Sequence, residues 1–218
     1  ARIDATFDVL GLATLQITGT SPLTGRSWHP GRIHMSAWDT ARLLWLLDPH
    51  APLPDWTAPD GAPVRTPLSP RSRELLNEWL HGQAFHDVLS TGTLCGKQHV
   101  AGGIPALVPA RWAKREGWSA GICNDAAEVT FAHKTGLTLN FGSDAGIVRG
   151  IPGRARRHYI ITFFSNLGHR YTDVDKLTDR GPCHDLGICY TQRIAGMAAR
   201  VDSAIAAAVE TAPTRQER

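Results

Sequence analysis

The chain has 218 residues, of which 42% are hydrophobic and 20% charged, a balance typical of a globular protein rather than a disordered one. Its formal net charge is +3, and no run of basic residues is interleaved with aromatic ones, which argues against a nucleic-acid-binding surface. No apolar run approaches the roughly 18 residues that a transmembrane helix requires. The opening stretch "ARIDATFDVL" lacks the basic start and apolar core of a signal peptide.

The first 35 residues are rich in turn-forming types, and the stretch "ITGTSPLTGRSWHPGR" within them is expected to form a long surface loop. Asp4 and Asp8 before it fit the start of a helix. The first clear helix begins in "SAWDTARLLWLL", with Ser36 as its N-cap and Asp39 three residues later, in the arrangement of a capping box. The spacing of its large apolar residues predicts a buried stripe made of Trp38, Leu43, Leu46 and Leu47.

A second helix is predicted from Ser69 through "PRSRELLNEWL", with Pro70 in its first turn. "FHDVLS" is predicted to continue helical structure as far as Gly92, and a loop and an insertion then lead to the strands. Four apolar residues of the second helix are expected to face inward: Leu75, Leu76, Trp79 and Leu80.

Three β-runs follow, "EVTFAHKT", "DAGIVRG" and "RHYIITFFS", joined by short connections that contain glycine. This pattern predicts an antiparallel meander. Between Asp185 and Glu210, apolar residues recur at three- and four-residue steps, which predicts a long amphipathic helix covering one face of that sheet. The fold class is therefore α+β, with helices before the sheet, and residues 211–218 are a polar tail.

The segment "AHKTG" followed by "SDAGIV" is the part of the sequence most suggestive of chemistry. Together with the next strand, the C-terminal helix and the two earlier helices, it resembles the C-terminal portion of the class A β-lactamase and penicillin-binding-protein superfamily. The resemblance covers about residues 36–209, and its recognised catalytic motif is the Lys-Thr-Gly box. It implies a β-lactamase/transpeptidase-like fold, with residues 1–210 as the C-terminal portion of that domain.

The resemblance also implies roles for four residues. Lys134 would supply electrostatic stabilisation and proton relay beside the serines of the site, and Thr135 would donate its hydroxyl to the substrate carboxylate. Gly136 would let the substrate lie close to the strand, because a side chain there would collide with it. The backbone N–H of Leu137 would be one donor of the oxyanion hole. A surface lysine in a hairpin is the alternative interpretation of Lys134.

The other serine elements of the superfamily are missing. No serine in the chain has a lysine three residues later, so there is no Ser-x-x-Lys nucleophile. A Ser-Asp-Asn element would fall near Arg32 and is not there. Because initiator Met, signal peptide and serine motifs are all absent, we expect Ala1 to follow on a longer N-terminal segment that carries the nucleophile. The chain would then hold half of a catalytic site.

The glutamate that frees the acyl group in class A enzymes has no counterpart here either. "ELLN" at Glu74 to Asn77 is one residue short of the required spacing and lies within the second predicted helix, so we interpret Glu74 as structural. Without that base, attack of water on an acyl-serine is expected to be slow. The predicted function is therefore a serine hydrolase or acyltransferase for β-lactams or related carboxylate-bearing amides and esters. An esterase or biosynthetic role is favoured over efficient β-lactam hydrolysis, and the alternative is a non-catalytic module that binds or senses β-lactams.

Several other residues have side chains that could contribute to a site. His133 should point to the face of the strand opposite Lys134, which favours a packing or surface role. "SDA" from Ser143 follows the Lys-Thr-Gly box and is interpreted as the start of the next strand. The basic segment "RARRH" at Arg154 to His158 is interpreted as a solvated turn.

The cysteines and histidines give no support for a metal site. Cys183, His184 and Cys189 do not match the usual zinc spacings, and no His-x-x-x-His pair is present. We expect no cofactor. The redox state of the cysteines stays open, and so does the compartment of this bacterial-type sequence: cytoplasmic for a biosynthetic enzyme, secreted for a resistance or cell-wall enzyme.

Overall fold

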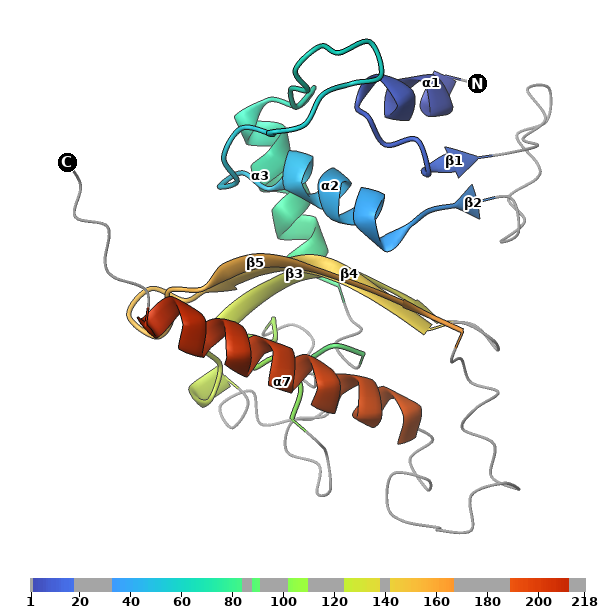
Figure 1. The fold of residues 1–218 in the computed structure, drawn as a ribbon. Coiled ribbons are helices and arrows are strands. Elements are labelled where there is room, and N and C mark those ends of the chain that lie inside the picture. The colour runs from blue at the N-terminus through green and yellow to red at the C-terminus, as the bar shows by residue number, and fades with distance from the viewer. Residues whose placement is uncertain are drawn as a thin grey trace. The chain divides into compact units, whose positions relative to one another are not determined.

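The computed structural model describes residues 2–17, 33–83, 88–90, 102–109, 124–137, 142–166 and 189–211. The chain divides into two compact units, Ala1–Glu78 and Trp79–Arg218 (Figure 1). In the first unit, helix α1 (Arg2–Val9) leads to a short antiparallel ribbon of β1 (Gln16–Ile17) and β2 (Ile33–His34), which is followed by α2 (Ala37–Leu47). Its core is apolar and consists of Leu10, Leu12, Leu15, Leu46, Ala58 and Val64.

The predicted start of α2 is confirmed, since the Ser36 hydroxyl accepts a hydrogen bond from the backbone N–H of Asp39 at 3.1 Å. The capping box is not reciprocal, however. The Asp39 carboxylate accepts from the backbone N–H of Thr14 at 2.8 Å and from its hydroxyl at 2.6 Å. The expected burial of Trp38 is wrong, because its side chain is 70% exposed and the guanidinium of Arg42 lies 5.7 Å from its ring centre.

Helix α3 (Pro70–His81) begins where the sequence predicts, with the Ser69 hydroxyl accepting from the backbone N–H of Ser72 at 3.1 Å. Its expected inward face is wrong for Trp79, which is 65% exposed, whereas Leu75, Leu76 and Leu80 are half-buried. Residues 85–87 of the predicted helical extension lie outside the described part of the chain, and residues 88–90 form a bend and a β-bridge instead of a helix.

The second unit contains the predicted meander. Strands β3 (Val129–Leu137), β4 (Gly142–Gly150) and β5 (His158–Ser165) are antiparallel neighbours in the order β3-β4-β5. Helix α7 (Cys189–Thr211) covers one face of this sheet (Figure 1). The α+β class, the antiparallel sheet and the C-terminal helix are therefore as predicted.

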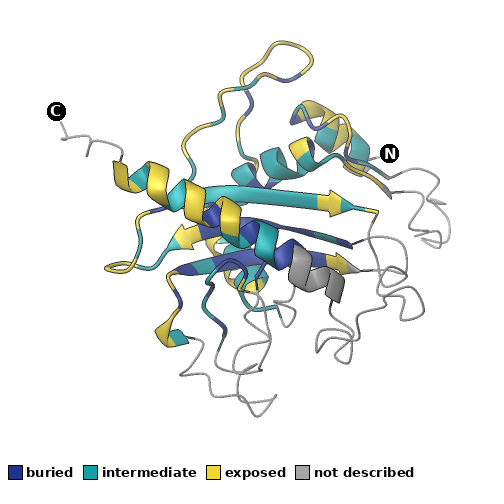
Figure 2. Cartoon of the chain, turned by 60° about the horizontal axis from the view of Figure 1, so that its bottom comes forward, coloured by how far each residue is buried: buried dark blue, intermediate teal, exposed yellow. Residues whose placement is uncertain are grey.

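The core of this unit lies between α7 and the sheet, where the side of the helix that faces the strands is buried (Figure 2). Phe131 and Val148 of the strands meet Ile194 and Ala198 of the helix. Because side chains alternate along a strand, His133 and Thr135 share the face of Phe131, whereas Lys134 leaves the sheet on the opposite face. Irregular segments complete the core with Val88, Leu89, Ile104 and Ala106.

A buried ion pair ties α7 to the sheet. The guanidinium of Arg157 donates to both carboxylate oxygens of Asp202, at 2.7 and 2.8 Å, and a third bond of 2.7 Å reaches Glu128. Tyr159 donates a hydrogen bond from its hydroxyl to Asp202 at 2.7 Å. Burial is the larger cause, and this hydrogen bond the next, of a pKa of Tyr159 that lies well above its usual range. The interpretation of "RARRH" as fully solvated is thus wrong for Arg157, whose side chain is only 4% exposed because Asp202 compensates its charge.

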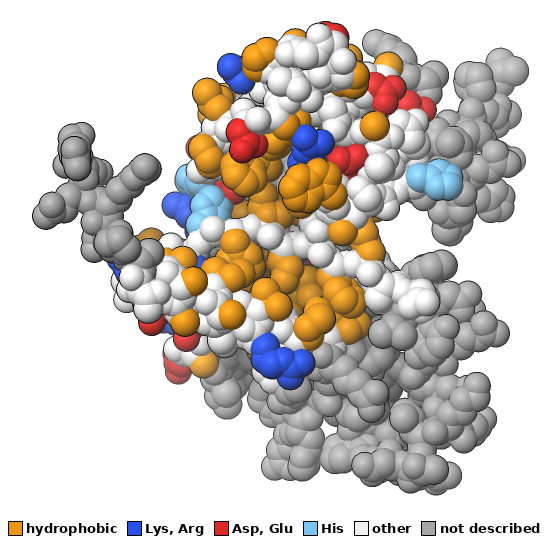
Figure 3. All heavy atoms as spheres, in the orientation of Figure 1, with side chains coloured by type: hydrophobic (Ala, Val, Ile, Leu, Met, Phe, Trp, Pro, Cys, Tyr) orange, Lys and Arg blue, Asp and Glu red, His pale blue; other side chains and the backbone are white. Residues whose placement is uncertain are grey.

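The outer side of α7 carries an apolar stripe that includes Val201, Ala204 and Ala208, and hydrophobic side chains gather over this helix in Figure 3. Within the described residues, no helix combines the length and the apolar character needed to cross a bilayer.

Candidate functional site

The Lys-Thr-Gly segment occupies the second half of β3, and its first two side chains leave the strand on opposite faces. Lys134 is exposed, whereas Thr135 is buried, with 6% of its surface exposed. A ligand that contacts both side chains would therefore have to lie along the outer edge of the strand, between the two faces.

The ladder fixes which backbone groups of β3 reach that edge. The N–H of Gly150 donates to Arg157 on the β5 side at 2.7 Å, so alternate residues of β4 bond to β5 and the intervening ones bond to β3. Lys134 lies opposite Ala145, and its backbone therefore points at β4. The backbone groups of Thr135 and Leu137 point outward, and no described strand pairs with them there.

The beginning of β3 supports the same assignment, because its outer edge is occupied. The N–H of Leu107 donates to the carbonyl of Val129 at 2.8 Å, and the N–H of Val129 donates to the carbonyl of Pro105 at 3.2 Å. Further along the strand, the ammonium of Lys134 donates to the outward carbonyl of Thr135. The edge beside Thr135 thus combines a positive charge with main-chain donors and acceptors.

Gly136 has a reason within the sheet to lack a side chain. A Cβ at this position would lie 2.6 Å from the hydroxyl oxygen of Ser143, its neighbour across the ladder. That hydroxyl donates to the carbonyl of Gly136 at 3.1 Å. The glycine therefore permits a side-chain bond between the strands next to the exposed edge.

Behind the segment lies a polar pair that sequence reasoning missed. His133 and Asp144 are both fully buried, and His133 Nδ1 lies 2.7 Å from Asp144 Oδ1. The second carboxylate oxygen of Asp144 accepts from the backbone N–H of Leu89 at 3.1 Å. Alternation correctly placed His133 opposite Lys134, but the strand register was needed to identify Asp144 as its partner. The interpretation of Asp144 as an ordinary strand-start residue is therefore incomplete.

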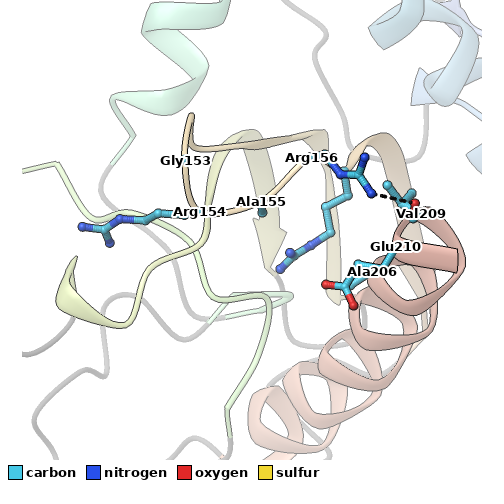
Figure 4. A pocket seen from close by; sticks show the side chains of 8 residues that line it. Gly153, Arg154, Ala155, Arg156, Ala206, Val209 and Glu210 are labelled. Carbon is cyan, nitrogen blue, oxygen red and sulfur yellow. Dashed lines mark hydrogen bonds between the residues drawn. The ribbon is translucent and has the colours of Figure 1, made fainter. Parts of the chain in front are cut away.

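A cavity of about 270 Å³ lies elsewhere, between the turn that joins β4 to β5 and the last turns of α7 (Figure 4). Its arginines already have partners: Arg156 donates to the carbonyl of Val209 at 3.3 Å, and Arg154 donates to the carbonyl of Ala127 at 2.7 Å. Arg157 is engaged by Asp202, as described above. These arginines hold the turn and the end of the helix in place through hydrogen bonds, so their guanidinium groups are not available to bind an anion.

The remaining candidates contribute no further chemistry in the described residues. Glu74 lies exposed on α3 with its carboxylate 3.5 Å from the guanidinium of Arg71, which agrees with its interpretation as structural. In the ranges that the structure describes, no three His, Cys, Asp or Glu side chains are placed to hold a metal ion. Three of the four cysteines, Cys95, Cys123 and Cys183, lie outside those ranges, as does His184.

Comparison of the chain with protein-family models, with curated proteins and with solved structures found no match.

Proposed function

We propose that this chain supplies the Lys-Thr-Gly strand of a serine acyl-transfer site of the β-lactamase-like type, acting on β-lactams or related carboxylate-bearing amides and esters. One observation carries the proposal. The outer edge of β3 at Thr135 and Leu137 is unpaired among the described strands, and the Lys134 ammonium bonds to the Thr135 carbonyl at that edge. An extended substrate with a carboxylate and an amide or ester carbonyl is complementary to such an edge.

Each part of the edge has a role in this chemistry. The ammonium of Lys134 attracts the substrate carboxylate and stabilises negative charge that develops beside the nucleophile. The outward N–H of Leu137 is oriented to donate to a carbonyl oxygen as it becomes an oxyanion. The sequence holds no Ser-x-x-Lys element, so the nucleophilic serine would come from sequence outside these 218 residues. Release of the acyl group would be slow, since no loop glutamate is present to activate water.

The absence of a Ser-x-x-Lys element also favours one alternative, a module that binds β-lactams without reacting with them. The two functions differ in a single observable. An acyl-transfer enzyme forms a covalent adduct with a penicillin, whereas a sensing module binds it reversibly.

The role of Lys134 is tested by replacing it with Ala in the full-length gene product and measuring the rate of acylation by a penicillin. We expect a loss of about 10²–10⁴-fold, the usual contribution of a positioned electrostatic or proton-transfer group. Folding should change little, because Lys134 is exposed and buries almost no surface. Arg149→Ala is the matched control, since it removes an exposed cation four residues from Ala145 on the same face of the sheet. Equal rates in both variants and the parent would refute the assignment.

A further inference from the structure

The pair formed by His133 and Asp144 is the most unusual feature of the sheet interior. Both side chains have no exposed surface, and His133 Nδ1 lies 2.7 Å from Asp144 Oδ1 on the face of the sheet that carries Phe131. Apolar side chains of similar volume would fill this space without the cost of removing polar groups from water. Burial alone therefore does not explain why a polar pair occupies the position.

The pair is placed where it can fix the Lys-Thr-Gly backbone. His133 directly precedes Lys134, and Asp144 is the residue that faces Thr135 across the β3–β4 ladder. The ring of His133 is also stacked on Phe131, with centres 3.9 Å apart and planes inclined by 12°. Lys134 leaves the backbone on the other face, so a rotation or shift at His133 would be transmitted directly to its ammonium.

Two further contacts restrict the pair. Gly146 lies opposite His133, and a Cβ there would come within 2.3 Å of the histidine Cβ, so the two strands approach as closely as their backbones allow. Asp144 also binds the backbone N–H of Leu89 at 3.1 Å, which connects the segment of residues 88–90 to β4. The carboxylate thus joins three pieces of backbone at one point.

From this geometry we infer that His133 and Asp144 are positioning residues: the buried pair holds β3 so that Lys134 and the outward groups of Thr135 and Leu137 meet the substrate in a reactive arrangement. The inference rests on the proposed acyl-transfer function. It concerns side chains that do not touch the substrate, and it predicts an effect on the rate of bond formation rather than on binding.

The test compares Asp144→Asn with the parent in the full-length gene product, using a penicillin as the probe. Stopped-flow kinetics separate the reversible dissociation constant from the acylation rate constant. We expect the dissociation constant to stay within about threefold and the acylation rate constant to fall about 10²-fold, because misplacement by about 1 Å costs that much in rate. His133→Asn keeps an N–H donor for the Asp144 carboxylate and should retain the rate to within about tenfold.

Asp202→Asn is the matched control, because it neutralises another buried carboxylate of the same unit that is bonded to Arg157 and Tyr159. All variants are measured at a temperature where each is folded by circular dichroism. If Asp144→Asn acylates as fast as the parent, or loses no more rate than Asp202→Asn, the positioning role is overturned while the proposed function stands. If the parent itself forms no adduct, the proposed function fails and the positioning role fails with it. If Asp144→Asn does not fold, His133→Phe decides, because it removes the ring nitrogen that lies 2.7 Å from Asp144 Oδ1. A loss of about 10²-fold in the acylation rate constant supports the positioning role, and a rate equal to that of the parent overturns it.

Discussion

Replacing Asp202 by Asn tests the ion pair that ties α7 to the sheet. The carboxylate accepts two bonds from Arg157 and one from Tyr159, all between 2.7 and 2.8 Å, and its own side chain is 4% exposed. Breaking a buried pair by removing one charge costs about 3–5 kcal/mol, because the other charge is left without its partner. In the variant, Glu128 still lies 2.7 Å from Arg157 and is 51% exposed, so part of the Arg157 charge stays compensated. The lower end of that range therefore applies. We therefore expect a loss of about 3 kcal/mol in the free energy of unfolding.

Chemical denaturation of the parent and of Asp202→Asn measures this loss directly, and thermal unfolding should show a lower Tm by about 6–12 °C. The surface pair of Arg71 and Glu74 gives the control, since its partners are 75% and 54% exposed and 3.5 Å apart. Glu74→Gln should change the stability by less than about 1 kcal/mol. A loss for Asp202→Asn no larger than that for Glu74→Gln would refute the reasoning that this ion pair stabilises the packing of α7.

Two more predictions concern the same sheet. The pKa of Tyr159 is raised from its ordinary value of 10.0 by burial and by the bond to Asp202, so the folded state binds the phenol proton more tightly than the unfolded state does. The contribution of Tyr159 to the free energy of unfolding is therefore present below pH 10 and is lost as the pH rises further. Tyr159→Phe should remove up to about 1.4 kcal/mol per pH unit from the alkaline decline in stability, and an unchanged decline would contradict the assignment. Gly146→Ala should destabilise the protein by about 3 kcal/mol or more, because the new methyl would lie 2.3 Å from the Cβ of His133. Gly196→Ala in α7, where a Cβ has open space, should instead stabilise the protein by about 0.5–1 kcal/mol, and similar urea midpoints for the two alanine variants would contradict this account.

The local signals in the sequence were sufficient for much of the fold. Ser36 and Ser69 mark helix starts through hydroxyl bonds that need only a few neighbouring residues. The meander and α7 follow from short connections and from apolar periodicity. Periodicity failed where a large side chain lies at a helix position that the protein leaves uncovered, as for Trp38 and Trp79. It identifies an apolar face, but it does not show whether another element packs on that face.

The sequence was sufficient to identify the Lys-Thr-Gly motif, but it did not show which side chains and backbone groups surround that motif. Alternation along β3 placed His133 opposite Lys134, and the structure agrees. Pairing His133 with Asp144 required the strand register, which depends on how the β3–β4 turn is made. The burial of Arg157 depends on Asp202, which lies 45 positions away on another element. Contacts of this range leave no trace in local composition.

The central claim is that the edge of β3 belongs to a serine acyl-transfer site that acylates readily and deacylates slowly. The most direct measurement is intact-mass spectrometry of the full-length gene product after mixing with a penicillin, with steady-state ring opening followed in parallel. We expect an adduct equal in mass to the penicillin that persists through many minutes, little ring opening, and faster turnover of ester substrates. Reversible binding without any adduct would contradict the claim in favour of a sensing module, and fast ring opening without a trapped adduct would show that another base replaces the missing glutamate.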